Sequence, residues 1–174
     1  MRRAFFFGDK TLEAAVRRVN EVRRVAVIGA GTMGQGIAID LLRKTDYDVI
    51  LLDVQAEALE RAKTKLSGLW QEQVAGNRMR PEDQAQLQRR TKYTQSYDAL
   101  KDADVVWEVA TERSEIKARI FETLEKTVDS GRIAAIFSNT SSHTTGELAV
   151  LFRSEACRAK FLTVDPYMRG RISG

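Results

Sequence analysis

The chain has 174 residues, 43% of them hydrophobic and 30% charged, which is enough for one globular domain with a packed core and a short extension. No apolar run is long enough to span a bilayer, and the apolar stretch near the N-terminus is too short for a signal peptide. The single cysteine, Cys157, excludes an internal disulfide framework and fits a reducing compartment, so we expect a cytoplasmic protein without a membrane anchor.

Basic residues outnumber acidic ones by 28 to 24, and many of the arginines occur in pairs. The pairs are Arg2-Arg3, Arg17-Arg18, Arg23-Arg24 and Arg89-Arg90. Such a surplus can attract nucleic acid or a polyphosphate. Because the pairs are scattered along the chain and no aromatic residues interleave with them, we interpret them as solvated surface residues and expect no nucleic-acid partner.

The first element expected is an amphipathic helix near the N-terminus. Within residues 10–23, apolar side chains recur at helical spacing, namely Leu12, Ala15, Val16, Val19 and Val22. We therefore predict an N-terminal helical extension over residues 1–23, packed on the domain that follows or on a partner chain. From residue 24 to residue 29 an apolar run is stopped by glycine, which is typical of a buried parallel strand.

Helices and strands then alternate to the end of the chain. Further strands are expected at residues 48–53, 92–94, 104–109, 132–138 and 160–164. Helices are expected from Thr32 or Met33, at 55–76, from Pro81, at 114–128 and at 147–152. In the helix at 114–128, the side chains predicted to face the sheet are Ile116, Ile120, Phe121 and Leu124.

These strands are mostly apolar along their length, as in sheets that are covered on both faces. The fold class predicted is therefore α/β, a doubly wound parallel sheet with helices on both faces and with the N-terminal helical extension. The domain is expected to span residues 24–165, followed by a short tail at 166–174.

A glycine-rich sequence joins the first expected strand to the helix after it. It reads Gly29-Ala30-Gly31-Thr32-Met33-Gly34. In this arrangement the first glycine allows a tight turn, the second lets the backbone approach a pyrophosphate, and the third allows close packing of helix on strand. The helix N-terminus offers aligned N–H groups to the anion. This context predicts a Rossmann-type dinucleotide-binding domain, with all six residues at the cofactor.

An acidic residue, Asp53, ends the second expected strand, 19 residues after Gly34. A carboxylate at this place accepts hydrogen bonds from the adenosine ribose and repels a 2′-phosphate. No arginine follows immediately, since the next residues are Val54 and Gln55, so NAD is expected over NADP. The alternative is that Asp53 only caps the next helix.

Three segments extend the pattern beyond the glycine loop. They are residues 25–38, residues 102–112 with Lys117 and Phe121 after them, and the Ser-Asn-Thr-Ser-Ser sequence at 138–142. In this order they resemble the NAD-binding, N-terminal domain of the 3-hydroxyacyl-CoA dehydrogenase family over about residues 24–150. The resemblance implies an oxidoreductase of fatty-acid or short-chain acyl-CoA metabolism that transfers a hydride between C3 of a 3-hydroxyacyl-CoA and NAD.

The same resemblance implies roles for residues that follow the expected strands. Glu112 and Lys117 would line the nicotinamide ribose region, while Asn139 and Ser141 would reach the nicotinamide and the substrate hydroxyl, Ser141 as the catalytic contact. Ligands bind at this edge of open parallel sheets, which agrees with the placement. Simpler interpretations stay open: a helix cap for Glu112, a surface lysine for Lys117 and a turn-forming cluster for 138–142. No metal site is expected.

The resemblance weakens toward the C-terminus. In the family a histidine supported by a glutamate takes the hydroxyl proton, and alignment on Phe161 puts Asp165 at its place. An aspartate ordinarily titrates near about 3.9 and is a poor base at neutral pH. The partner glutamate and the family's second, helical domain have no counterpart in these 174 residues. His143, the only histidine, is the alternative base, and a solvated loop residue is its simpler interpretation.

The end of the chain matches another group better. Residues 161–171 are similar to a segment near the N-terminus of the zinc-independent medium-chain reductases. A fusion junction, a frameshifted or truncated gene, or chance would each explain this similarity.

Three hypotheses for the function follow. The leading one is a chain that binds NAD but, without a partner chain or the helical domain, turns over acyl-CoA slowly or not at all. The second is a non-catalytic NAD-binding module of a larger assembly, docked through the N-terminal helix. The third is a basic nucleic-acid binder that reuses the fold.

Overall fold

The computed structural model of the chain describes residues 21–129 and 131–164. The predicted N-terminal helical extension lies outside the described residues apart from its last three positions, and so do Asp165 and the tail at 166–174. The described residues cover the domain expected at 24–165 apart from residues 130 and 165.

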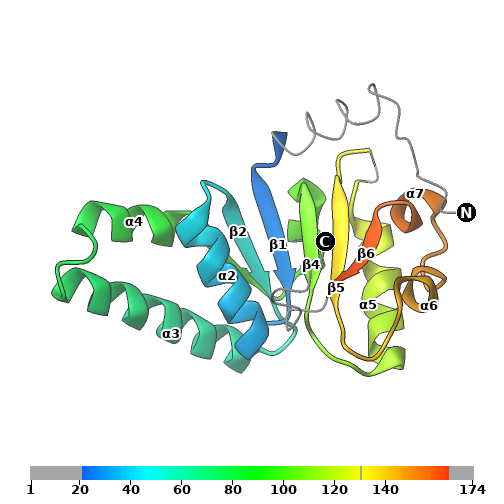
Figure 1. The fold of residues 1–174 in the computed structure, drawn as a ribbon, viewed down its shortest axis with the longest axis horizontal. Coiled ribbons are helices and arrows are strands. Elements are labelled where there is room, and N and C mark those ends of the chain that lie inside the picture. The colour runs from blue at the N-terminus through cyan, green and yellow to red at the C-terminus, as the bar shows by residue number, and fades with distance from the viewer. Residues whose placement is uncertain (1–20, 130, 165–174) are drawn as a thin grey trace, which may run out of the picture.

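Six parallel strands form one sheet in the order β3-β2-β1-β4-β5-β6. The strands are β1 (Arg24–Ile28), β2 (Asp48–Leu52), β3 (Thr91–Thr94), β4 (Val105–Glu108), β5 (Ala135–Asn139) and β6 (Phe161–Val164). Their carboxyl ends meet at one edge, the lower edge in Figure 1. The strand order reverses between β1 and β4, and open parallel sheets bind ligands at such a switch point. The predicted doubly wound sheet is confirmed.

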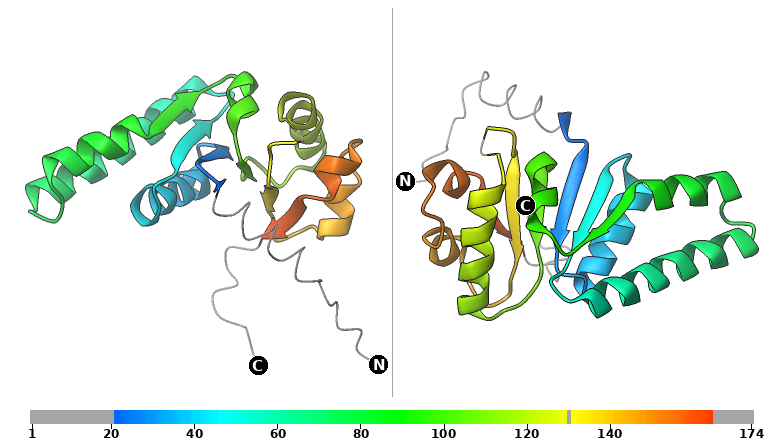
Figure 2. Two further views of the ribbon diagram at one scale, coloured as in Figure 1. Left: turned by 90° about the horizontal axis from the view of Figure 1, so that it is seen from above. Right: turned by 180° about the vertical axis from the view of Figure 1, so that it is seen from behind.

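Helices cover both faces of this sheet (Figures 1 and 2). They are α2 (Thr32–Lys44), α3 (Ala56–Ala75), α4 (Pro81–Arg89), the 3-10 helix η1 (Tyr97–Asp102), α5 (Ser114–Thr127), α6 (Thr145–Ala149) and α7 (Glu155–Arg158). Leu42 and Trp70 pack with Val27 on one face. Phe121 packs with Ile28 on the other face, because side chains alternate along a strand. No helix in residues 21–129 or 131–164 is both long and apolar enough to cross a membrane.

Most expected boundaries agree with the structure to within about a residue, but β5 and α6 differ. Strand β5 begins at Ala135 and not at Arg132, because the N–H groups of residues 132 and 133 donate to the Asp129 carbonyl in a turn. Helix α6 begins earlier than expected, since Thr144 and Glu147 form a reciprocal capping box. The helices η1 and α7 were not predicted, because segments this short show no helical periodicity.

Helix α5 presents nearly the predicted side to the sheet, with one difference in its first turn. Ile116 is 36% exposed, so its predicted inward position is wrong. Lys117 is fully buried in its place, together with Ile120, Phe121 and Leu124. A lysine is rarely buried unless it is paired, and Lys117 forms an ion pair with the equally buried Glu108.

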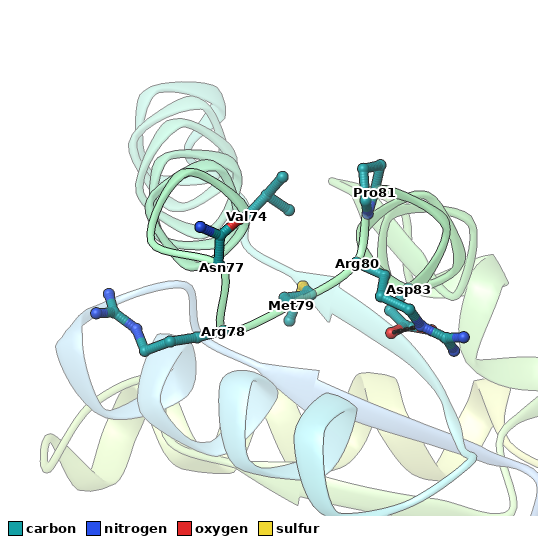
Figure 3. A pocket seen from close by; sticks show the side chains of 7 residues that line it. All are labelled: Val74, Asn77, Arg78, Met79, Arg80, Pro81 and Asp83. Carbon is teal, nitrogen blue, oxygen red and sulfur yellow. Dashed lines mark hydrogen bonds and ion pairs between the residues drawn. The ribbon is translucent and has the colours of Figure 1, made fainter.

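Helices α3 and α4 form a hairpin that projects from one side of the sheet (Figures 1 and 2). Its turn contains Asn77 at a φ of 54°, a conformation that asparagine adopts more readily than most residues. Next to the turn, the Arg80 guanidinium donates to both carboxylate oxygens of Asp83 at 2.9 and 2.8 Å. A hollow of about 440 Å³ lies at this tip, beside Val74 and Met79 (Figure 3). None of the predicted site residues lines it.

Candidate functional site

The candidate site is a cleft at the carboxyl edge of the sheet, where the strand order reverses. Its volume is about 710 Å³. Gly29 after β1 and Asp53 after β2 line the cleft, as do Tyr97 of η1 and Arg119 of α5. Two residues predicted to bind the cofactor therefore lie in one cavity.

The first and third glycines of the loop after β1 are required by close packing. Gly29 has a φ of +110°, and a Cβ there would lie 2.8 Å from the Ala110 Cα in the loop after β4. A Cβ on Gly34 would lie 1.8 Å from the Gly29 carbonyl oxygen. A Cβ on Gly31 meets no atom within 4 Å, so the space above this glycine is open for a ligand. These are the three roles that the glycine pattern predicts.

Helix α2 begins without a cap. Its N-cap residue is Gly31, no side chain bonds to the exposed N–H groups, and the first turn contains no acidic residue. The N–H of Gln35 donates to the Gly31 carbonyl at 3.0 Å. Within the described part of the chain, the N–H groups of Thr32, Met33 and Gly34 have no acceptor. They remain available to an anion at the positive end of the helix.

Asp53 is bonded to the glycine loop. Its Oδ2 accepts from the Ala30 N–H at 2.8 Å, and its Oδ1 accepts from the Gln55 N–H at 2.9 Å. On the other side of the loop, the buried Gln35 amide donates to the Ala30 carbonyl at 2.8 Å. Because a carboxylate offers about four lone-pair sites, both Asp53 oxygens can still accept from ribose hydroxyls. Asp53 does not cap α3, because the N-cap residue of that helix is Gln55 and no side chain bonds to its first N–H groups. Its role at the ribose stays a prediction.

Two further elements, η1 and α5, complete the walls of the cleft. Tyr97 is half-buried; burial raises the pKa of its hydroxyl, and the carboxylates of Glu108 and Asp53 raise it further. The phenol therefore remains protonated at neutral pH and can donate a hydrogen bond. Arg119 lines the cleft from α5 and is exposed, so its guanidinium is available to a ligand.

A fully buried ion pair lies behind the end of β4. Lys117 Nζ is 2.6 Å from Glu108 Oε2 and 3.1 Å from Ser138 Oγ, and all three residues are 0% exposed. Ser138 Oγ donates to the same carboxylate oxygen at 2.5 Å, and the Ala110 N–H donates to the other at 2.9 Å. Both charges are thus paired and hydrogen-bonded, which buried ions require.

This arrangement decides between the two interpretations of Lys117 only in part. The interpretation as a surface lysine is wrong. The ammonium also does not reach the cleft surface directly: its only contact toward that surface is the Asn139 carbonyl, at 3.5 Å. A role at the nicotinamide ribose stays a prediction, and it would have to act through neighbouring groups.

A second polar cluster lies in the loops after β4 and β5. Thr140 Oγ1 donates to Glu112 Oε2 at 2.8 Å and lies 3.3 Å from His143 Nδ1. The other ring nitrogen of His143 lies 3.0 Å from Ser114 Oγ. The side chains of His143 and Glu112 are 21% and 47% exposed. His143 is therefore a bonded member of this cluster and not a freely solvated loop residue.

Asn139 and Ser141 follow β5 at the same edge of the sheet. The Asn139 Oδ1 atom is buried and has no hydrogen-bond partner among the described residues. Ser141 is exposed, and its hydroxyl has no partner within residues 21–129 and 131–164. Unsatisfied buried polar atoms are rare in folded proteins, so this oxygen lacks a partner that the described residues do not supply.

Several residues of the site were not predicted from the sequence: Glu108, Ser114, Ser138 and Thr140. The signal for Glu108 was a single acid in the otherwise apolar strand β4, and a lone buried charge requires a partner. Ser138 and Thr140 lie in the segment at 138–142 that resembles the family, although neither was given a role there, and Ser114 carries no signal beyond its polarity. The described residues contain no group of three or more His, Cys, Asp or Glu side chains that could hold a metal.

Comparisons with known proteins identify the family of the chain. A family profile described as 3-hydroxyacyl-CoA dehydrogenase, NAD binding domain, matches residues 24–163. The chain is 34% identical over 128 residues to a 3-hydroxybutyryl-CoA dehydrogenase of Bradyrhizobium diazoefficiens, covering 74% of this chain and 43% of that protein. It is 30% identical over 142 residues to the fatty acid oxidation complex subunit alpha of Colwellia psychrerythraea, covering 79% of this chain and 19% of that protein.

Solved structures agree with the sequence matches. The structure of a 3-hydroxybutyryl-CoA dehydrogenase from Escherichia coli has a TM-score of 0.74 at 30% identity, covering 83% of this chain and 29% of that one. The chain thus spans less than half the length of each of these relatives. The open space at Gly31, the uncapped start of α2 and the remaining lone pairs of Asp53 fit the NAD that the family binds. The chain belongs to the 3-hydroxyacyl-CoA dehydrogenase family of oxidoreductases, of which it carries the NAD-binding domain.

Proposed function

We propose that this chain is the cofactor-holding half of a dehydrogenase that acts on 3-hydroxyacyl-CoA substrates. The observation that carries the proposal is the uncapped start of α2 behind the loop at 29–34, with Asp53 bonded to that loop, at the same sheet edge as Asn139 and Ser141. Two of the relatives above are named as 3-hydroxybutyryl-CoA dehydrogenases, which supports a short acyl-CoA as substrate class.

In this proposal the cleft beside Asp53 holds the adenosine. The Asp53 carboxylate accepts hydrogen bonds from the ribose hydroxyls, and the free N–H groups at the start of α2 bind the diphosphate. Arg119 supplies a planar cation for the face of the adenine ring. The Tyr97 hydroxyl adds a neutral hydrogen-bond donor to the same cleft.

The nicotinamide end then lies at the loops after β4 and β5. Glu112 accepts from the nicotinamide ribose. Asn139 Oδ1, which is buried and without a partner among the described residues, turns toward the carboxamide when the cofactor binds. The Ser141 hydroxyl contacts the substrate hydroxyl, and the buried Lys117 ammonium lies 3.5 Å from the Asn139 carbonyl. NAD, when bound, supplies the hydride acceptor.

We further propose that this chain needs a second component for rapid turnover. Oxidation of a hydroxyl group requires a base near neutral pH, and both ring nitrogens of His143 are already engaged. Asp165, outside the described residues, stands where the family has its base. A helical domain or partner chain that supplies a base and the acyl-CoA pocket would complete the enzyme.

Asp53→Asn tests the adenosine site. The substitution keeps the shape of the side chain but removes a charge-assisted acceptor, so the affinity for NADH should fall about tenfold to hundredfold. The preference for NADH over NADPH should also narrow, because the charge that repels a 2′-phosphate is gone. Calorimetric titration measures both. Asp40→Asn, at an exposed position bonded to Lys44, is the matched control; equal affinities in all three proteins would refute the adenosine site.

An acetoacetyl-CoA assay tests the catalytic half of the proposal. We expect the chain to bind NADH but to oxidise it very slowly with this substrate. Activity that appears when a separate helical domain of the family is added would identify a half-enzyme, while persistent inactivity with intact NADH binding would favour the non-catalytic NAD-binding module. Rapid oxidation of NADH by the chain alone would refute the proposal that it lacks a catalytic base.

Other expectations from the sequence stay predictions. The cytoplasmic location, the docking role of the N-terminal helix and the reductase-like similarity of residues 161–171 are not tested by the described residues. Retention on DNA that is independent of Asp53 and falls steeply with salt would be needed to support a nucleic-acid partner.

A further inference from the structure

His143 joins the two loops that lie at the proposed nicotinamide end. One loop follows β4 and leads through Glu112 to Ser114, the first residue of α5. The other follows β5 and contains Thr140 and His143. The ring of His143 reaches Thr140 Oγ1 through Nδ1 at 3.3 Å and Ser114 Oγ through Nε2 at 3.0 Å. It therefore links the first residue of α5 to the loop after β5, in addition to the buried link through Lys117.

The hydrogen bonds of this cluster have a definite direction, because a hydroxyl carries only one hydrogen. The Thr140 hydrogen goes to Glu112 Oε2 at 2.8 Å. Its bond with His143 must then be donated by Nδ1–H, with Thr140 Oγ1 as acceptor. In the neutral ring Nε2 is then the acceptor, and it takes the hydrogen of Ser114 Oγ. A chain of donors thus runs from Ser114 through His143 and Thr140 to the Glu112 carboxylate.

The Glu112 carboxylate, at the end of this series of hydrogen bonds, is the least constrained group in it. The Glu112 side chain is 47% exposed, and its Oε1 has no partner within the described residues. Thr140, by contrast, is 4% exposed, so its hydroxyl is a fixed donor. With Oε2 held by Thr140, the free Oε1 is oriented in advance, which lowers the entropy lost when a ligand hydroxyl binds to it.

We propose that His143 is a positioning residue for the nicotinamide half of the cofactor, acting through Thr140 to orient the Glu112 carboxylate. The inference rests on the proposed function, since it assumes that Glu112 accepts from the nicotinamide ribose. It assigns His143 a role other than that of a base. It also gives Ser114 a part in the site, as the anchor that holds the ring.

Three ligands separate the two halves of the cofactor. ADP carries only the adenosine and diphosphate, ADP-ribose adds the second ribose, and NADH adds the nicotinamide. His143→Leu keeps an apolar side chain in the loop but removes both hydrogen bonds. We expect the affinities for NADH and ADP-ribose to fall about threefold to tenfold, which is the loss of about one hydrogen bond. The affinity for ADP should stay within about twofold.

Two more conservative variants test the donor direction of these hydrogen bonds. His143→Asn keeps an N–H donor close to the place of Nδ1, so it should recover most of the affinity for NADH that His143→Leu loses. Ser114→Ala removes only the anchoring hydroxyl, so its loss should lie between those of the two His143 variants. Unchanged ADP affinity in each variant reports an intact fold, and thermal unfolding provides the same check without ligand.

The single histidine of the chain gives a spectroscopic readout. In the neutral ring, the ¹⁵N shifts of His143 should show hydrogen on Nδ1 and none on Nε2, and the signals should move on addition of ADP-ribose but little on addition of ADP. A ring protonated on Nε2 alone would overturn the proposed chain of donors.

The outcomes of the titrations are distinct. If the unmodified chain binds neither ADP nor NADH, the proposed function fails and the role of His143 fails with it. If ADP and NADH bind and His143→Leu leaves NADH unchanged, or weakens ADP as much as NADH, the positioning role alone is overturned.

Discussion

At the proposed adenosine end of the site, beside the loop at 29–34, the backbone defines the geometry. At the proposed nicotinamide end, in the loops after β4 and β5, side chains from three elements define it. Gly29 and Gly34 are fixed by close steric contact, and Asp53 is held by the N–H groups of Ala30 and Gln55. At the other end, the buried pair of Lys117 and Glu108 joins α5 to β4. The hydrogen bond from Thr140 to Glu112 joins the loops after β4 and β5.

The two ends are therefore stabilised differently: steric packing of the backbone fixes one, and the electrostatics of buried side chains fixes the other. Positioning backbone N–H groups costs little free energy, because steric contacts and the α2 helix already fix them. A buried ion pair carries a large desolvation cost that only a complete set of partners offsets. Changes at the adenosine end should therefore alter binding more than stability, and changes beneath the nicotinamide end should alter stability first.

The largest effect is expected from breaking the buried pair. Lys117→Met fills a similar volume but leaves the Glu108 carboxylate buried without its cation, so the free energy of unfolding should fall by about 3–5 kcal/mol. Urea unfolding at neutral pH measures this. The double variant Lys117→Met with Glu108→Gln removes both charges and should recover much of the loss. A single variant as stable as the unmodified chain would show that the pair is not buried as described.

Next in size is the effect of a methyl group in the glycine loop. Gly34→Ala places a Cβ 1.8 Å from the Gly29 carbonyl oxygen, so the start of α2 must move away from the loop. The N–H groups at the start of α2 would then no longer align with the diphosphate. The affinities for ADP and NADH should both fall about tenfold to hundredfold, the loss of one or two charge-assisted hydrogen bonds, as measured by calorimetry.

Gly36→Ala is the matched control for this variant, because it lies in the same helix and its Cβ would meet no atom within 4 Å. It should leave both affinities unchanged and raise the free energy of unfolding by about 1 kcal/mol, the difference in helix propensity. If the two alanine variants bind ADP equally well, the close packing of α2 on the loop after β1 is not what forms the site.

The same contrast explains how much the sequence could predict. The glycine loop and Asp53 were predicted because their positions follow from local backbone geometry and from a fixed spacing after a strand. The alternation of apolar strands and helices predicted the sheet for a similar reason, since its period is visible within each segment. The adenosine end and the fold are local properties of the chain.

The proposed nicotinamide end depends on contacts between residues that are far apart in the sequence. Periodicity favoured Ile116 over Lys117 as the inward residue of α5, because a lysine is normally solvated. The partner that reverses this preference is Glu108, on a different element, and the donor that orients Glu112 is Thr140, 28 positions along the chain. Neither pairing leaves a periodic or compositional mark, so only the folded chain reveals them.

The smallest effect concerns helix starts, which also differ between the two ends. Helix α2 at the adenosine end is uncapped, whereas α6, after the loop of His143, begins with the capping box of Thr144 and Glu147. The backbone N–H and the hydroxyl of Thr144 lower the pKa of Glu147 by hydrogen bonding to its carboxylate. A lowered pKa in the folded state means that this contribution to stability is complete above the ordinary glutamate pKa of about 4.3 and is lost as the pH falls through the folded value.

Glu147→Gln should therefore be slightly less stable than the unmodified chain at pH 7, and the difference should shrink on acidification below about pH 4. Urea unfolding of both proteins across this range gives the difference at each pH. Glu72→Gln, on α3, is the control, since its side chain has no hydrogen-bond partner among the described residues, and it should show no such trend. A difference for Glu147→Gln that stays constant with pH would mean that the charge of the carboxylate does not contribute to the capping of α6.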